Sequence, residues 1–286
     1  MAAITTAFVK QFSSNLFHNV QQKGSRLRNT VLLKTDVVGE ETSMDQVGKQ
    51  LAIKKMARNS DTPIRQPNLS RRWITLYDYE VAKLHDKQDQ LKMLADPTSN
   101  YVQGQAFALG RAMDDEIIVA ASGTARTDKT GSTSTTFPAS QKVVVAASGL
   151  TLAKLFSTKE ILDGNEVDED EDKYMIVSAK QMTNLLNTTE VKNTDYNTVK
   201  ALVEGKVNEF MGFKFKRSER LETDDSDSRL VLAYARTGIG LAIAQDIKTD
   251  IGVRRDKSMA KQVYASLGIG ASRLEEEKVV QIACSE

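Results

Sequence analysis

The side chains that carry most enzyme and metal chemistry are few in this sequence and lie far apart in it. The 286 residues contain two histidines, His18 and His85, and one cysteine, Cys284. Metal sites and nucleophilic sites need several such groups within a few ångströms of one another. His85 stands beside Asp86, but no neighbouring cysteine or histidine completes a ligand set. We therefore expect both histidines to be surface residues and Cys284, which lies in an apolar run, to be a buried and unreactive thiol.

Two further motifs have the wrong spacing for the chemistry they suggest. In the acidic run 163–172, Gly164 directly follows Asp163 and is therefore the second residue of the run. A calcium loop instead needs a glycine at its sixth position and a glutamate at its twelfth. Gly238-Ile-Gly240 resembles part of a dinucleotide-binding turn, but Ile243 occupies the third small-residue position and little chain follows. No phosphate-loop or nucleophile-elbow pattern is present. We therefore predict no enzyme activity, no cofactor and no bound metal.

The composition is that of a soluble globular chain with a hydrophobic core. Lys and Arg number 39 against 38 Asp and Glu, the net charge is +1, and 40% of the residues are hydrophobic. These values exclude a collagen-like or wholly disordered chain, and a dedicated nucleic-acid binder would be more basic. A single cysteine excludes an intrachain disulfide. No window approaches the roughly 18–20 consecutive apolar residues of a membrane span, so we expect no membrane contact.

The N-terminal segment combines basic charge with a helical apolar pattern. Residues 1–35 contain five basic residues and no acid. Apolar side chains recur at every fourth position, which predicts an amphipathic helix; they are Ile4, Phe8, Phe12, Leu16 and Val20. The segment is either an organelle transit peptide or an arm that docks on a neighbouring protein. Its low arginine content favours the arm.

The next segment, residues 36–94, has little core pattern. Its centre is basic and carries Pro63 and Pro67, and the run from Trp73 to Val81 alternates as a strand does. Two extended runs around a polar centre predict a long two-stranded loop. Such a loop buries too little apolar surface to be stable alone, so it must project or lie on another body.

A long helix and a compact α+β body are predicted to follow. Asp96-Pro97 begins a helix with a continuous apolar stripe, and Gly123 ends it. In the body, Ser148 is expected to cap a helix that carries Leu152, Leu155 and Phe156. The remaining predicted elements are a strand 174–177, a helix opened by the capping box Ser178–Gln181, a helix 196–202, extended segments around Gly212, and strands 230–234, 241–243, 262–267 and 279–284.

The order of these elements resembles the Hong Kong 97-type fold of tailed-bacteriophage major capsid proteins. Three local stretches resemble habits of that family: a strand followed by a helix at 173–186, a glycine-centred pair of extended segments at 202–218, and the closing segment 270–282. The resemblance covers nearly the whole chain. It implies an α+β fold with five parts, namely an N-terminal arm 1–35, an E-loop 36–94, a P domain 95–148 with its spine helix 97–122, an A domain 149–244 and return strands 245–286.

The resemblance also implies a structural function. Copies would form pentamers and hexamers that close into an icosahedral shell around double-stranded DNA, in a virion assembled in the bacterial cytoplasm. The implied partners are other copies, scaffolding and portal proteins, DNA bound without sequence preference, and an optional decoration protein. Residues 1–95 hold 15 basic and 9 acidic residues, and we place this surplus at contacts between subunits. The predicted subunit-contact residues are Phe8, Phe12, Arg26, Arg28, Arg65, Arg71, Arg72 and Trp73.

Some members of this family join a lysine of the E-loop to an asparagine of a neighbour. Lys54 and Lys55 lie in the loop, but no receiving asparagine can be matched, so this activity is not expected here. Two alternatives stay open. One is an encapsulin-type compartment that encloses an enzyme within the same architecture. The other is an organelle-imported enzyme that loses about 30 N-terminal residues.

Overall fold

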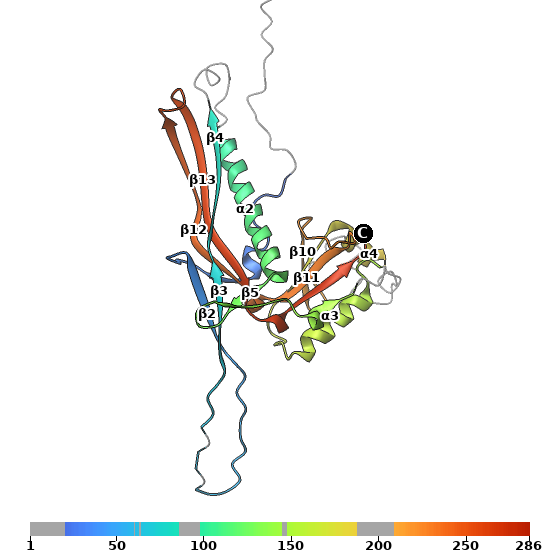
Figure 1. Cartoon of the computed structure of the whole chain (residues 1–286). Helices are drawn as coiled ribbons and strands as arrows, with labels where there is room; N and C mark the ends of the chain where they lie inside the picture. Colours follow the sequence, from blue (N-terminus) through green and yellow to red (C-terminus); the bar gives the residue numbers. More distant parts are fainter. Residues whose placement is uncertain (1–20, 60, 63, 86–97, 145–147, 188–208) are drawn as a thin grey trace, which may run out of the picture. The chain divides into compact units, whose positions relative to one another are not determined.

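The computed structural model describes residues 21–59, 61–62, 64–85, 98–144, 148–187 and 209–286 (Figure 1). The predicted amphipathic helix, with Phe8 and Phe12, and the predicted helix 196–202 lie outside these residues. The chain forms two compact units, the first from residues 1–25, 78–112 and 245–268 and the second from the remainder. The described part is α+β, as predicted.

The second unit contains a six-stranded mixed sheet with helices beside it. Its strand order is β7-β14-β11-β8-β10-β9. The strands are β7 (Lys142–Val143), β8 (Lys173–Val177), β9 (Glu209–Phe210), β10 (Phe213–Arg217), β11 (Arg229–Ala235) and β14 (Val279–Cys284). Every residue of β8 is buried, in agreement with the apolar run 174–177 that makes up most of it. The two helices are α3 (Leu152–Gly164) and α4 (Ala179–Asn187).

Capping residues explain where these two helices begin. Ser148 is not the cap of α3, as the sequence prediction had it. Thr151 holds that position, and its hydroxyl accepts a hydrogen bond from the Lys154 amide. Phe156, expected in the core, is exposed. The predicted cap of α4 is confirmed, because the Gln181 amide donates to the Ser178 hydroxyl at 3.2 Å.

A second sheet of the same unit carries the extended loop. Its order is β2-β3-β5-β6, from β2 (Glu41–Val47), β3 (Leu69–Thr75), β5 (Ala125–Thr127) and β6 (Thr133–Thr135). Strands β2 and β3 pair antiparallel from Glu41 opposite Thr75 to Val47 opposite Leu69. The predicted strand 73–81 is in fact divided at Leu76, between β3 and β4 (Tyr77–His85).

The predicted long helix is confirmed as α2 (Thr98–Ser122). Gly123 ends it, and its amide donates to the Val119 carbonyl at 2.8 Å. The buried stripe of α2 includes Leu109, Met113 and Ile117.

The third sheet has the order β1-β12-β13-β4 and contains the two longest strands. Its strands besides β4 are β1 (Leu32–Lys34), β12 (Ile239–Arg254) and β13 (Ala260–Arg273). The short tail strands predicted at 241–243 and 262–267 are therefore parts of much longer strands. The sequence pattern does not predict the outer parts of these two strands, because residues 248–259 are all exposed. Without an alternation of buried apolar and exposed polar side chains, a strand has no period-two signal in the sequence. The remaining elements are short 3₁₀ turns at Arg28–Thr30, Ala139–Gln141, Arg236–Gly238 and Glu276–Lys278.

Candidate assembly surface

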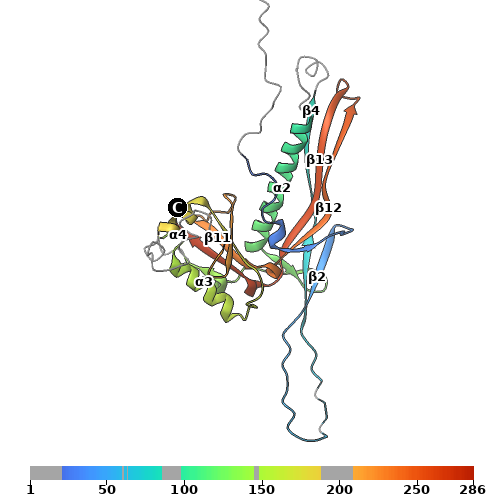
Figure 2. The same cartoon turned by 180° about the vertical axis from the view of Figure 1, so that it is seen from behind.

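The segment that joins β2 to β3, residues 48–68, carries several exposed large apolar side chains. It projects from the sheet as two extended arms and a tip (Figures 1 and 2). Met56 is 87% exposed and Ile64 is 90% exposed, and Leu51 and Ile53 are exposed as well. Large apolar side chains gathered on one exposed segment mark an interaction site. We refer to residues 48–68 as the projecting loop.

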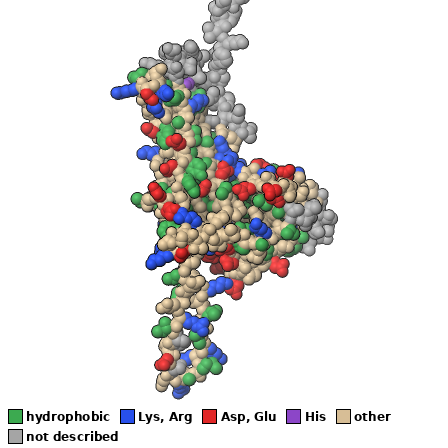
Figure 3. Space-filling view, in the orientation of Figure 1, with side chains coloured by type: hydrophobic (Ala, Val, Ile, Leu, Met, Phe, Trp, Pro, Cys, Tyr) green, Lys and Arg blue, Asp and Glu red, His purple; other side chains and the backbone are tan. Residues whose placement is uncertain are grey.

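The projecting loop is also basic. It contains Lys49, Lys54, Lys55, Arg58 and Arg65 and only one acid, Asp61. Figure 3 shows these cations interspersed with apolar side chains along the loop. The predicted contact residue Arg65 lies here and is exposed. A surface of this kind fits a partner that is apolar and acidic.

The base of the loop makes two contacts within its own chain. The Gly48 amide donates to the Asn68 carbonyl at 2.7 Å, which extends the β2–β3 pairing by one step. The Lys49 ammonium lies 2.7 Å from a carboxylate oxygen of Glu166, in the acidic turn after α3. The Lys49 ammonium lowers the pKa of the Glu166 carboxyl, and the Glu166 carboxylate raises the pKa of the Lys49 amine.

Arg72 anchors β3 through a buried ion pair. Its Nη2 lies 2.6 Å from a carboxylate oxygen of Glu276, and its Nε donates to the Leu274 carbonyl at 2.8 Å. Beside this pair, the guanidinium of the fully buried Arg273 donates to the carbonyls of Ala121 and Gly123, at the C-terminal end of α2. Burial lowers the pKa of Arg273. The Arg72 side chain thus already has its partners within the chain.

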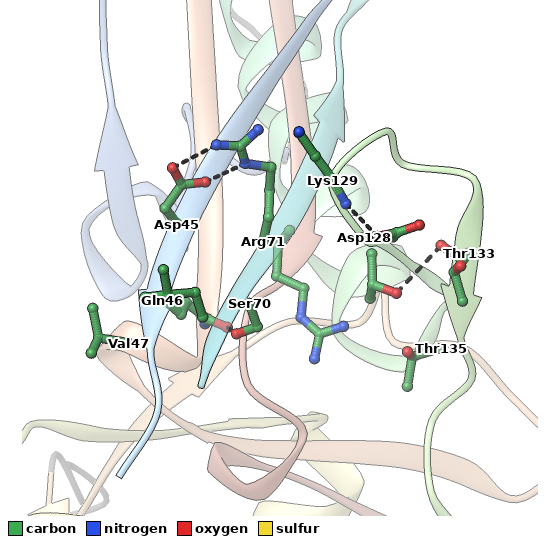
Figure 4. A pocket seen from close by; sticks show the side chains of 12 residues that line it. Asp45, Gln46, Val47, Ser70, Arg71, Asp128, Lys129, Thr133 and Thr135 are labelled. Carbon is green, nitrogen blue, oxygen red and sulfur yellow. Dashed lines mark hydrogen bonds and ion pairs between the residues drawn. The ribbon is translucent and has the colours of Figure 1, made fainter. Parts of the chain in front are cut away.

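Arg71 and Trp73 also contact their own chain. Arg71 donates two hydrogen bonds to Asp45 of β2, and this pair lines a groove of about 870 Å³ between β3 and the β5–β6 hairpin (Figure 4). The Trp73 indole N–H donates to the Asp128 carbonyl at 2.8 Å, and its ring lies against Gly131. Contacts of these residues with other copies stay predictions.

The segment before β1 is tied to α2 by one carboxylate. Asp114 is fully buried, and its side chain accepts hydrogen bonds from the amides of Arg26 and Leu27 at 3.1 Å. The Arg26 guanidinium donates to the Arg217 carbonyl at 2.7 Å, and Arg28 is half-buried. The last ten residues of the predicted arm are therefore part of the second unit's own packing, which the charge pattern alone did not reveal.

Of the histidines and the cysteine considered for chemistry, the structure describes Cys284 and His85. Cys284 is buried, and burial raises the pKa of its thiol to about 11. His85, expected at the surface, is half-buried with its ring edge-on to Tyr101 at 5.6 Å, because it lies near the start of α2. Within the described ranges, no three His, Cys, Asp or Glu side chains gather as metal ligands would, and no helix is long and apolar enough to cross a membrane.

Comparison with known proteins shows the family to which the chain is similar. A family model described as phage capsid protein matches residues 4–286. The capsid structure of cyanophage P-SCSP1u matches with a TM-score of 0.76 and 17% identity, over 98% of this chain and 94% of that one. The capsid of cyanophage Pam1 matches with a TM-score of 0.73 and 14% identity, over 99% and 98%. The capsid of a native GTA particle matches with a TM-score of 0.71 and 12% identity, over 99% and 98%. A search of curated proteins found no match.

Proposed function

The chain belongs to the phage capsid protein family and has the Hong Kong 97-type fold, and from this premise we propose that its copies assemble as pentamers and hexamers into an icosahedral shell around double-stranded DNA. The role is structural rather than catalytic. The projecting loop is the observation that carries the proposal. Its base is hydrogen-bonded within the chain while its apolar and basic side chains are exposed, which supports cover by a second copy.

The second unit also carries a groove whose lining complements the projecting loop. It has a volume of about 520 Å³ and combines the exposed apolar side chains of Val119 and Val144 with two carboxylates, Glu222 and Asp224, and one cation, Lys142. The groove of Figure 4 has more cations than carboxylates in its lining, with Arg71, Arg72 and Lys129 beside Asp45 and Asp128. Basic and apolar side chains of the loop fit the first groove better. We place the loop of one copy there on the next.

Many modest contacts of this kind suit a closed shell. Association must overcome the loss of translational and rotational freedom, which costs about 4–15 kcal/mol per binding event. Closure makes the contacts multivalent, so their sum becomes cooperative. A net charge of +1 keeps repulsion between copies small. On this proposal the partners are further copies, scaffolding and portal proteins, an optional decoration protein and packaged DNA, in a virion assembled in the bacterial cytoplasm.

Electron microscopy of the purified full-length chain tests the proposal. Closed hollow particles built from pentamers and hexamers are the expected result, whereas a chain that stays monomeric at every concentration contradicts it. Mass spectrometry and nucleic-acid staining of particles isolated from infected cells then separate the two shell functions. DNA as the content supports the phage shell, and an enclosed enzyme without DNA supports the encapsulin-type compartment.

Disulfide trapping tests the placement of the loop. A mixture of Met56→Cys and Val144→Cys chains should form a linked heterodimer within particles. A matched mixture of Met56→Cys and Val38→Cys should not, although Val38 is 95% exposed. Equal linking in both mixtures would refute this placement while leaving shell assembly intact.

A further inference from the structure

We propose that the projecting loop of a copy is energetically coupled to that copy's own groove at Val119 and Val144, through the buried side chains of Arg72, Glu276 and Arg273. A loop that docks in the groove of one copy then orders the base of that copy's own loop, so each contact favours the next. This inference rests on the placement of the loop proposed above. All of these residues lie in the second unit.

One end of the coupling is the C-terminal end of α2, which forms part of the groove. Val119, Ser122 and Gly123 line the groove there. The fully buried guanidinium of Arg273 donates to the Ala121 carbonyl at 3.1 Å and to the Gly123 carbonyl at 2.6 Å. The last carbonyls of a helix have no partner within the helix, so these hydrogen bonds hold the end of α2 in place. A ligand that packs in the groove therefore acts on carbonyls that Arg273 holds.

The other end of the coupling is the base of the projecting loop, on β3. The Asn68 carbonyl, which accepts the Gly48 amide, directly precedes β3, and Arg72 lies within that strand. The Arg72 Nε donates to the Leu274 carbonyl at 2.8 Å, and its Nη2 lies 2.6 Å from a carboxylate oxygen of Glu276. Both side chains of this ion pair are largely buried. The position of β3, and with it the base of the loop, therefore depends on the position of Glu276.

Between these two ends lies an ion pair that is too long for a hydrogen bond. The Arg273 Nε and the Glu276 Oε1 are 3.7 Å apart, whereas hydrogen bonds between such groups measure about 2.7–2.9 Å. Both atoms are buried, and neither has a hydrogen-bond partner among the described residues. Buried polar atoms without partners are unfavourable, so an arrangement that brings these two together is stabilised. The link therefore has an open arrangement, seen in the single chain, and a closed one.

Closing this link joins the two contact surfaces of one copy. A shift of about 0.8 Å brings the Glu276 carboxylate within hydrogen-bond distance of Arg273. The closed link then orders the end of α2 and the base of the loop together. A contact at either surface meets this ordering cost once, and the second contact benefits from it. Coupling between binding free energies is reciprocal, so a filled groove strengthens the docking of the loop, and a docked loop strengthens binding in the groove.

Hydrogen exchange in a disulfide-linked pair of full-length chains tests the coupling. The heterodimer of Met56→Cys and Val144→Cys chains, trapped in solution or released from oxidised particles, holds one loop in one groove. The Met56→Cys chain also carries Val144→Lys, whose cation keeps the basic loop of its partner out of the second groove. Only the Val144→Cys chain is isotope-labelled, so its Gly48 amide reports on the base of a loop that is itself undocked.

The expected result is that this amide exchanges at least about fivefold more slowly in the linked pair than in the Val144→Cys chain alone. Equal exchange rates would overturn the coupling, although the linking itself would still support the placement of the loop. A linked pair that forms neither in solution nor in particles would refute the placement, and the coupling with it.

Glu276→Gln in the labelled chain separates the coupling from the contact itself. The glutamine oxygen can still accept from Arg72, but its amide group sets a second donor against the Arg273 Nε, so the link cannot close. Linking should persist, while the slowing of Gly48 exchange should fall below about twofold, the loss expected when the coupling is removed. Glu277→Gln is the matched control, because this neighbour is exposed and lies outside the link, and it should keep the full slowing. Full slowing with Glu276→Gln, or its loss with Glu277→Gln, would contradict the proposal.

Discussion

Serine at Met56 and Ile64 of the projecting loop should weaken assembly without weakening the fold. Both side chains are almost fully exposed in the single chain, so their removal should change the free energy of unfolding by less than about 0.5 kcal/mol. In the shell each is expected to become buried against another copy. Burying one such side chain contributes about 1.5–3 kcal/mol, so the pair contributes about 3–6 kcal/mol for each loop.

A tenfold change in an equilibrium constant corresponds to about 1.4 kcal/mol, so the double variant should need at least about a hundredfold higher concentration to assemble. Sedimentation velocity over a concentration series measures this shift, and urea unfolding of the unassembled chain measures stability. Val38→Ser is the matched control, since Val38 is 95% exposed but lies outside the loop, and it should alter neither quantity. An unchanged assembly concentration for the double variant, or an equal loss of stability, would refute the reasoning.

Three further predictions concern the interior. Arg72→Ala should lower the free energy of unfolding of the unassembled chain by about 1–3 kcal/mol in urea, because Glu276 then keeps only its 3.7 Å pairing with Arg273 and the Leu274 carbonyl loses its donor; an unchanged midpoint for Arg72→Ala would show that this arginine acts only between copies. Asp114→Ala should cost about 1–3 kcal/mol and speed hydrogen exchange of the backbone amides at 26 and 27, which lose their acceptor, and unchanged exchange would disprove the anchor. The Cys284 thiol should not react with a thiol reagent at pH 8 until the chain is unfolded, since burial raises its pKa to about 11, and rapid labelling of the native chain would contradict this.

Local signals in the sequence predicted much of the fold. The apolar stripe before Gly123 predicted α2, the capping spacing at Ser178 predicted the start of α4, and the continuous apolar run 174–177 predicted the buried strand β8. Each signal depends on neighbours within a few residues. The order of elements then predicted the capsid fold, which the family match and the solved structures confirm.

The features that the sequence left undetermined depend on contacts between distant residues. No local pattern shows that Asp114 accepts the amides of Arg26 and Leu27, which lie 88 and 87 positions away. The Arg72–Glu276 pair joins residues that are 204 positions apart in the sequence. The charge of Arg72 alone assigned it to a contact between copies, whereas the structure shows that it forms an ion pair within its own chain. The length of β12 was underestimated because its outer half has no buried face.

A cryo-electron microscopy map of the assembled particle is the most direct test of the claim that copies cover one another's exposed surface. We predict closed shells in which Leu51, Met56 and Ile64 of each projecting loop are buried against a second copy. Shells in which these three side chains face solvent, or a chain that forms no shells at all, would contradict it.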